Sequence, residues 1–267
     1  MQMISLLWID LAVASTLILA LALLNMRLRL GQSRQLLVST GRMFIQLVLV
    51  GFILKALFTY QNILIVSVIA IVMIMIAGYE IVSRQHRRFV GGWSFSLGVT
   101  SMFVSSLTLA VFALLVLIEP TPWYTPQYAI PLLGMLLGNT MNGISLALDR
   151  LTEDAWQQQA AIEGQLMLGK TSREAILLIE RASLRSALTP TINAMAVSGI
   201  VALPGMMTGQ IMAGADPLDA VKYQILIMLL IATGVGFGSL IAVWFGARRL
   251  FDHRQRLRLD RLTTVDK

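Results

Sequence analysis

The chain has 267 residues, of which 57% are hydrophobic and 13% are charged, and its mean hydropathy is +0.75. Soluble domains carry about 25% charged residues, so this composition excludes a soluble single-domain protein and indicates a chain embedded in a membrane. The sequence contains no cysteine, which excludes disulfides, thiolate metal sites and cysteine nucleophiles. The net charge of +7 comes from Lys and Arg beside apolar segments. We attribute it to membrane topology and anionic lipid headgroups, and we expect no binding of nucleic acid.

Seven segments are apolar and long enough to cross a bilayer. A spanning helix needs roughly 20 mostly apolar residues, and the segments that meet this description cover residues 4–26, 36–58, 63–79, 97–118, 129–148, 188–213 and 223–247. The first segment has no positive charge before it, so we expect it to stay in the mature protein rather than to be cleaved as a signal peptide. The sequence therefore predicts an all-α polytopic membrane protein in which residues 1–267 form one transmembrane domain.

The positive charges predict the orientation of these seven helices. All Lys and Arg residues except Lys55 and Lys222 lie in or beside the connections that follow the first, third, fifth and seventh segments. Cytoplasmic loops retain Lys and Arg. We therefore predict that the N-terminus lies outside and the C-terminus inside.

Small and amide residues distinguish the fifth and seventh segments. Gly134 and Gly138 are four residues apart in the fifth, and Asn139 and Asn142 are three apart. Small residues at this spacing let membrane helices approach closely, and Asn side chains pair across such contacts. We expect the fifth segment to face protein rather than lipid, and residues 234–238, with the sequence GVGFG, to form a second packing surface.

Residues 149–187 form the one long connection, and we predict that it lies in the cytoplasm. It is too short for a soluble catalytic domain. Its composition favours a helix, a break at Gly169, and a second helix capped by Ser172. Such a helix-turn-helix could dock into a groove on a soluble partner, and an amphipathic helix lying on the membrane is the alternative.

Residues 164–171, with the sequence GQLMLGKT, match the pattern of a phosphate-binding loop. That chemistry needs a buried strand before the loop, whereas the preceding residues are polar and favour helix. We interpret the match as chance, and we expect that this chain does not itself hydrolyse ATP.

The sixth segment is interrupted by residues that bend or break helices, namely Pro190, Pro204, Gly205 and Gly209. Interrupted spans often mark transport sites, because their freed carbonyl groups can line a cavity. The alternative is a kinked helix that uses glycines for packing and methionines as gap fillers. The pathway candidates on the fifth and sixth segments are Asn139, Asn142, Asn193, Met206, Met207 and Gln210. No cluster has the spacing of a metal site, so the metal ligands are left unassigned.

A membrane enzyme is disfavoured by the residues that are missing. An intramembrane serine protease needs a Ser–His pair, and none of the seven segments contains a histidine. The HExxH motif of a metalloprotease and a pair of membrane aspartates are also absent from the sequence. We therefore expect that the chain is not a membrane enzyme.

Four stretches of the sequence, in this order, are those of a known family. They are GRMFIQLVLVGFILK at residues 41–55, PLLGMLLGNTMNG at 131–143, EGQLMLGKTSREA at 163–175, and the long stretch at 185–225 that begins RSALTPTINAMAVSG. With these stretches the chain resembles the FetB family of ABC-transporter permeases, which is linked to iron export and has plant relatives linked to aluminium tolerance.

The resemblance implies partners. A separate ATPase subunit would bind ATP and Mg, and this chain would bind no cofactor itself. Two permease chains and two ATPases would assemble. Glu163, Gly169 and Arg173 fall on the segment that resembles the ATPase-contact loop of bacterial permeases.

Together these features predict a multi-pass permease of the bacterial inner membrane, a homodimer that exports iron or a related metal with a separate ATPase. Two alternatives stay open. One is a permease of the same family that moves another solute, and the other is a stand-alone channel or secondary transporter.

Overall fold

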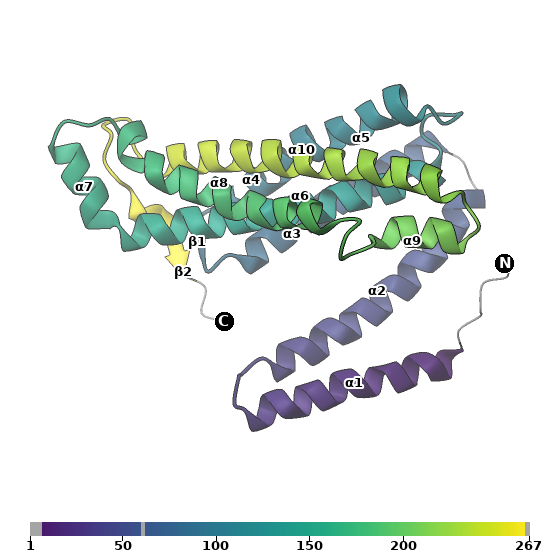
Figure 1. Cartoon of the computed structure of the whole chain (residues 1–267). Helices are drawn as coiled ribbons and strands as arrows, with labels where there is room; N and C mark the ends of the chain where they lie inside the picture. The colour runs from purple at the N-terminus through teal and green to yellow at the C-terminus, as the bar shows by residue number, and fades with distance from the viewer. Residues whose placement is uncertain (1–6, 60–61, 265–267) are drawn as a thin grey trace. The chain divides into compact units, whose positions relative to one another are not determined.

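The structure, a computed structural model, describes residues 7–59 and 62–264 and is mostly helical (Figure 1). It divides into two compact units. One contains α1 (Trp8–Arg27) and α2 (Ser33–Thr59), together with residues 212–214. The other contains the rest of the described chain from Asn62 onwards.

The smaller unit is a helical hairpin. A short turn joins α1 to α2, and Arg29 and Gly31 in that turn have positive φ angles of 53° and 73°. The Ser33 hydroxyl donates a hydrogen bond to the carbonyl of Ala22 across the hairpin, at 3.1 Å. Most apolar side chains of both helices are exposed within the chain, which suits helices that face lipid or another subunit.

Five long helical segments form the larger unit. They are α3 (Ile63–Arg84), the continuous segment 93–118, α6 (Pro126–Gln157), α8 (Ser172–Val197) and α10 (Pro217–Arg249). Segment 93–118 consists of α4 (Trp93–Met102), the π-helical turn η1 (Phe103–Leu107), α5 (Thr108–Phe112) and a second π-helical turn, η2 (Ala113–Ile118). The shorter elements are α7 (Gln159–Met167), α9 (Gly205–Met212), the 3-10 turn η3 (Leu259–Arg261), and the strands β1 (Arg87–Phe89) and β2 (Leu262–Thr264).

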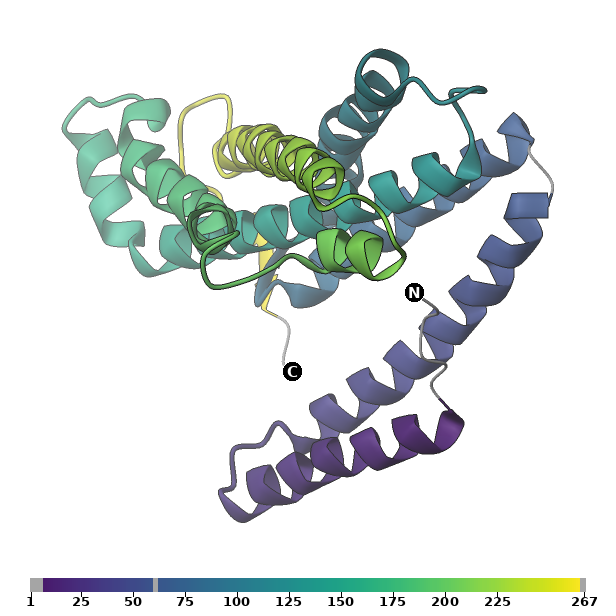
Figure 2. The same ribbon diagram turned by 45° about the vertical axis from the view of Figure 1, so that its right-hand side comes forward.

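Helix α6 is the central helix of the larger unit, where it packs against α3, α4, α8 and α10 (Figures 1 and 2). Close contact with α10 depends on three glycines. A methyl group added at Gly143 would lie 2.6 Å from Val235, and one at Gly238 would lie 2.7 Å from Thr140. A methyl group at Gly234 would lie 3.0 Å from the Thr140 hydroxyl.

The expectation that Gly134 and Gly138 form the close packing surface of α6 is wrong in its choice of glycines. Gly138 has no heavy atom within 4 Å of the position of an added methyl group, and Gly134 has a side chain at 3.5 Å. The close approach on this helix is at Gly143 instead. The expectation for residues 234–238 agrees with the contacts at Gly234 and Gly238.

Six helices among residues 7–59 and 62–264 are long and apolar enough to cross a membrane: α1, α2, α3, segment 93–118, α6 and α10. The sixth expected span, residues 188–213, is the one that does not form a single helix. Helix α8 begins at Ser172, passes through Pro190 and ends at Val197, and α9 begins at Gly205. The chain does not break at Pro190, because α8 continues beyond it.

The interruption lies between Val197 and Gly205. Gly199 has φ +82°, a conformation that a residue with a side chain rarely adopts. Its N–H donates to the carbonyl of Ala202 at 2.9 Å, so a local turn replaces the helix. Pro204 follows directly before α9, where its missing N–H is not needed. Gly209 lies within α9 with open space around it.

The connection 149–187 is helical, with a turn at Gly169, which has φ +87°. It contains the end of α6, all of α7 and the first part of α8. Thr171, rather than the expected Ser172, caps α8, because its hydroxyl accepts the N–H of Glu174. The residues before the GKT sequence form helix α7 and not a strand, which agrees with the interpretation of the phosphate-loop pattern as chance.

The α6–α10 contact predicts the effect of one methyl group. We expect Gly238→Ala to lower the stability of the protein by about 1–3 kcal/mol, because the methyl group would overlap Thr140 and lie 2.9 Å from the Ser105 hydroxyl. The measurement is the thermal unfolding midpoint of the purified full-length protein in detergent. Gly236→Ala is the matched control, since its nearest neighbour would lie 3.9 Å away. Equal midpoints for the two variants would contradict this account of the packing.

Candidate functional site

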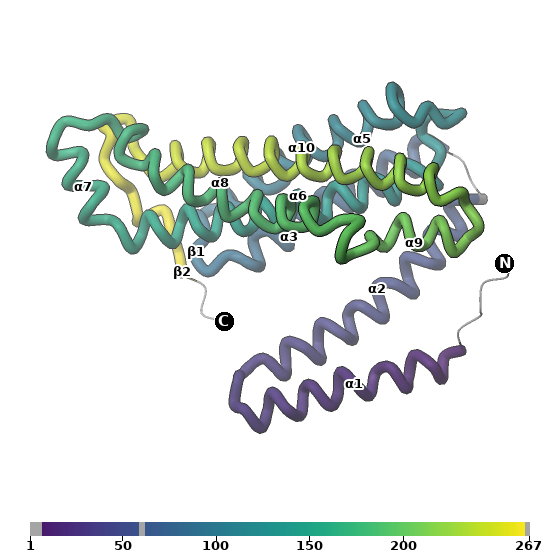
Figure 3. The backbone as a smooth tube through the Cα atoms, viewed as in Figure 1, coloured from purple at the N-terminus to yellow at the C-terminus, as the bar shows by residue number. Residues whose placement is uncertain are grey.

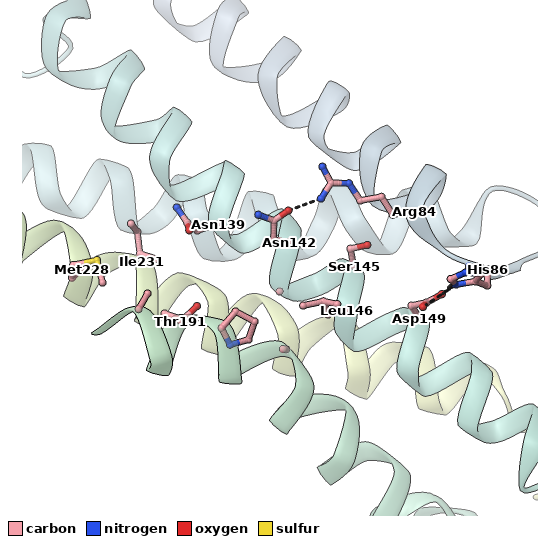
Figure 4. Close-up of a pocket in the computed structure, with 14 residues that line it drawn as sticks. Arg84, His86, Asn139, Asn142, Ser145, Leu146, Asp149, Thr191, Met228 and Ile231 are labelled. Atoms are coloured by element: carbon pink, nitrogen blue, oxygen red, sulfur yellow. Dashed lines mark hydrogen bonds and ion pairs between the residues drawn. The ribbon is translucent and has the colours of Figure 1, made fainter. Parts of the chain in front are cut away.

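A cavity of about 550 Å³ opens where the C-terminal end of α3 meets α6, α8 and α10 (Figure 4). Its polar lining includes Arg84, His86, Asn139, Asn142, Ser145, Asp149 and Thr191. Ala187, Pro190 and Ala194 of α8 and Met228 and Ile231 of α10 supply much of the apolar lining. A volume of this size admits a small hydrated or chelated solute.

Two polar contacts join the end of α3 to α6 across the cavity lining, and Figure 4 shows both. The Arg84 guanidinium donates a hydrogen bond to Asn142 Oδ1, and it also lies 3.9 Å from the Glu80 carboxylate. The backbone N–H of His86 donates to Asp149 Oδ1 at 2.7 Å, and the His86 ring Nδ1 lies 3.1 Å from Asp149 Oδ2. These contacts hold the end of α3 against α6.

A third contact continues this series beyond the cavity. Arg87 Nε donates to Glu153 at 2.9 Å, and the Arg87 guanidinium lies 4.2 Å from the centre of the Trp156 ring. The Thr152 hydroxyl donates to the backbone carbonyl of Arg87 at 3.1 Å. These bonds join the last residue of α3 and two residues just after it to one face of α6. We call the contacts of Arg84, His86 and Arg87 with α6 the α3–α6 latch.

Sequence reasoning missed Arg84, His86 and Asp149 as lining residues. One signal was present. Asn139, Asn142 and Asp149 are separated by three and seven residues, which places them on one face of a helix. Their partners on α3 could not be recognised in the same way, because they lie 58 and 63 positions away along the chain.

The structure brings together some of the predicted pathway residues and not others. Asn139 and Asn142 line the cavity, and the Asn139 amide donates to the carbonyl of Met135 at 2.8 Å. Asn193 is exposed on α8 next to two residues that do line it. The three candidates on α9 are not among the lining residues and stay predictions: Met206, Met207 and Gln210. Among the described residues, no group of three or more His, Asp or Glu side chains is placed to hold a metal ion.

The turn between α7 and α8, residues 167–171, forms a protruding elbow. Met167 and Leu168 at its tip are 84% and 83% exposed. Glu163 is exposed on α7 and accepts a hydrogen bond from the Gln159 amide at 2.9 Å. Gly169 provides the positive φ that the turn requires. An exposed apolar tip on a rigid turn is suited to contact with another protein.

The first turn of α8 is held by a reciprocal cap. The backbone N–H of Thr171 donates to the Glu174 carboxylate at 2.8 Å, and the Thr171 hydroxyl donates to the same group at 2.8 Å. These two bonds, the backbone bond first, hold the pKa of Glu174 below its usual value. The cap keeps the elbow rigid.

Arg173 is the second residue of α8 and lies beside a smaller cavity of about 220 Å³. Glu180 of α8 and Trp244 and Arg248 of α10 share that lining. Burial raises the pKa of Glu180, and the positive charge of Arg173 opposes this shift. The Arg248 guanidinium lies 3.6 Å from the centre of the Trp244 ring.

The segment after α10, residues 250–264, returns to the end of α3; we call it the tail (Figure 3). Strand β2 of the tail pairs with β1 in antiparallel register, with Arg87 opposite Thr264 and Phe89 opposite Leu262. The Arg261 guanidinium donates to the carbonyl of Arg249 at 2.7 Å. The tail is therefore a fixed part of the larger unit, attached next to the latch.

Asp252 organises the turn at the start of the tail. Its carboxylate accepts the backbone N–H groups of Arg254 and Arg256, each at 2.9 Å, and the Arg256 side chain at 2.9 Å. The bond from the Arg256 N–H is the largest cause that lowers the pKa of Asp252, to about 2, while burial opposes the shift.

This lowered pKa predicts how the tail responds to acid. The contribution of the Asp252 carboxylate is fully present above the unfolded value near 3.8 and is lost as the pH falls through about 2. The His253→Cys variant can carry a single fluorophore, because the chain has no other cysteine. As the pH falls, we expect the fluorophore to become more mobile, with a midpoint near pH 2 in its fluorescence anisotropy. With Asp252→Asn added, the anisotropy should show no transition in this range. A midpoint near pH 4 in the His253→Cys protein would contradict the lowered pKa of Asp252.

Comparison with known proteins gives the family. Residues 8–251 match a family described as Uncharacterised protein family (UPF0014). A UPF0014 membrane protein of Synechocystis is 41% identical over 89% of this chain and 91% of its own length. The rice UPF0014 membrane protein STAR2 is 35% identical over 87% of this chain and 80% of its own. The Escherichia coli protein named "Probable iron export permease protein FetB" is 30% identical over 93% of each chain.

No solved structure matches the chain significantly. The family match covers most of the sequence, and the relatives align over nearly their whole lengths. The resemblance to the FetB family is thereby confirmed. With its several apolar helices, this chain is a multi-pass membrane protein that belongs to the UPF0014 family.

Proposed function

We propose that this protein is the membrane-spanning permease of an ABC transporter in a bacterial inner membrane. A second copy of the chain and two separate ATPase subunits complete the assembly, and ATP and Mg bind to those subunits. The solute is iron or a related metal species, moved out of the cytoplasm, by analogy with the printed name of the Escherichia coli relative. The observation that carries the proposal is a polar cavity in an otherwise apolar helix bundle, with a protruding helical elbow on the extensions of the same helices.

The distribution of charge supports an orientation in which the elbow and the tail face the cytoplasm. Lys170, Arg173, Arg254 and Arg256 belong to these two segments, and short cytoplasmic segments retain Lys and Arg. The part of α8 that follows the cavity, together with α9, then provides a discontinuous seventh crossing. Discontinuous helices with free backbone groups are characteristic of transport sites in membranes.

The α3–α6 latch suggests how the ATPase subunits would change the cavity. Closure of the ATPase subunits on ATP would move the elbow, and with it the cytoplasmic extensions of α6 and α8. Since Asn142 and Asp149 lie on α6, a shift of that helix would lengthen their contacts with Arg84 and His86. Each conformation would expose the cavity to one side, and ATP would change the ratio of the two.

One observation favours a second candidate solute. The cavity lining carries the Arg84 guanidinium as well as the Asp149 carboxylate, so it lacks the excess of negative charge that favours a bare metal cation. An anionic or chelated species would accept the guanidinium as a hydrogen-bond donor. A permease of the same family for an anionic solute is therefore the alternative, whereas no contact in the described chain specifically favours a stand-alone channel.

The orientation can be tested with single cysteines, because the natural sequence has none. Leu168→Cys in the elbow and His253→Cys in the tail should react with a membrane-impermeant maleimide in inverted vesicles and not in intact spheroplasts. Tyr128→Cys, at the opposite end of α6, should show the reverse pattern. Labelling of the elbow and the tail from different sides would refute the proposed topology.

The transport function can be tested in proteoliposomes that contain the full-length protein and the ABC ATPase that copurifies with it. We expect ATP-dependent uptake of Fe²⁺ into vesicles whose elbow faces outward. Asn142→Leu should reduce this flux at least about tenfold, because it removes the contact with Arg84 and fills part of the cavity. The amount of bound ATPase should stay unchanged.

Thr233→Val is the matched control, since Thr233 is exposed on α10, away from the cavity lining, and should keep normal flux. If Asn142→Leu lowers only the abundance of the protein, Asn142 has a packing role. If no ATPase copurifies and the protein alone gives flux, the channel alternative is correct. A flux of chelated iron without a flux of free Fe²⁺ would favour the second candidate solute.

A further inference from the structure

We propose that the hollow between α7 and the tail turn receives an acidic segment of the ATPase subunit, so that the tail forms the second half of the docking surface. This inference rests on the proposed function and extends it. Sequence reasoning placed docking on the elbow alone, through Glu163, Gly169 and Arg173. The structure adds a second wall from the other end of the chain.

The hollow has a volume of about 800 Å³ and two walls. Its lining comes from α7 and the elbow on one side and from the tail turn, residues 253–257, on the other: Glu163, Leu166, Met167, Gly169, Lys170, His253, Arg254, Gln255, Arg256 and Leu257. In Figures 1 and 3 the tail runs beside the α7–α8 turn. The hollow is therefore continuous with the exposed tip at Met167 and Leu168.

The tail wall is rigid, because its turn is bonded to α8. The Gln255 side chain accepts the backbone N–H of Ser172 at 2.8 Å, and this N–H is one of the free donors in the first turn of α8. Gln255 itself has φ +58°, a strained conformation for a residue with a side chain. Such strain persists where the surrounding contacts enforce it, here the cap on α8 and the Asp252 turn.

The charge of the hollow identifies the chemistry of its occupant. Its cations are Lys170, Arg254 and Arg256, and Glu163 is its one carboxylate. Arg256 is held by Asp252 at 2.8 Å, and the Gln159 amide holds Glu163. Since Asp252 pairs with Arg256, the remaining charges of the lining are the two cations Lys170 and Arg254, one on each wall, and the Glu163 carboxylate, so the net charge stays positive. Leu166, Met167 and Leu257 add apolar side chains to the same lining. This arrangement complements an acidic segment that carries an apolar side chain.

A protein segment fits this hollow better than a lipid surface. The last residues of α6 and the first of α7 are Trp156, Gln157, Gln158 and Gln159, all exposed. Side-chain amides are poorly suited to burial in a bilayer. Helix α6 also extends about 12 Å beyond Asp149 before α7 begins, at a rise of 1.5 Å per residue, which carries α7 away from the cavity.

Docking on the tail would also affect the cavity, because the tail is bonded to the segment that carries the latch. The tail ends in β2, which pairs with β1, and β1 begins at Arg87, directly after His86. Backbone hydrogen bonds therefore connect the proposed docking surface to the α3–α6 latch. An ATPase that contacts both walls would act on α8 through the elbow and on the end of α3 through the tail.

The test uses the full-length protein in nanodiscs and the ATPase identified by copurification. Lys170→Glu combined with Arg254→Glu should weaken association about 10- to 100-fold and should remove most of its dependence on ionic strength. The control is Arg88→Glu combined with Arg181→Glu, which makes the same change in charge at exposed positions outside the hollow. The control should bind like the natural sequence.

Each outcome decides between named possibilities. Equal affinity and equal salt dependence in the natural protein and the Lys170/Arg254 variant would overturn the inference while the proposed function stands. If the natural protein binds no ATPase, the proposed function and the docking inference are both wrong. A difference that vanishes in nanodiscs without anionic lipid would identify lipid as the occupant and overturn the inference. Lys170→Glu alone, which leaves the tail intact, should show part of the effect and guards against misfolding of the double variant.

Discussion

The contact between α6 and α10 at Gly143, Gly234 and Gly238 is the constraint on which the larger unit depends. In a bilayer the lipid tails are as apolar as the side chains, so helices associate through close van der Waals contact rather than through the hydrophobic effect. The three glycines permit that contact, because a methyl group at any of them would come within 2.6–3.0 Å of a neighbouring atom. Because α3, α4 and α8 pack against the same central helix, its position relative to α10 also determines the width of the cavity.

Helix α6 runs without a break from the cavity to Gln157, and α7 continues from there to the elbow. Asn142 and Asp149 contact the end of α3 at the cavity, and Glu153 makes the next contact one turn further on. The helix continues to Gln157, and α7 begins two residues later. The latch, the elbow and the tail therefore belong to one hydrogen-bonded framework.

Several features could be predicted from the residues, and others could not. The apolar segments that became α1, α2, α3, segment 93–118, α6 and α10 were predicted because length and hydropathy are properties of each segment alone. The turn at Gly169 was predicted for a similar local reason. Sequence reasoning chose Gly134 and Gly138 as the packing surface of α6, whereas Gly143 makes the close contact, because the rotation of a helix about its axis depends on its neighbours. Arg84 and His86 were missed because their partners are distant along the chain.

The amino-acid order alone established that the chain belongs in a bilayer, where six of its long apolar helices lie, and which residues could share a face of α6. Hydropathy, backbone preference and helical period act over a few residues, so they can be recognised without knowledge of the neighbouring helices. The cavity, the contacts of Arg84 and His86, and the place of the tail beside α7 emerged only when the helices were packed together. These features depend on hydrogen bonds and close contacts between segments far apart in the chain, such as Gln255 with Ser172, and no local pattern contains that information.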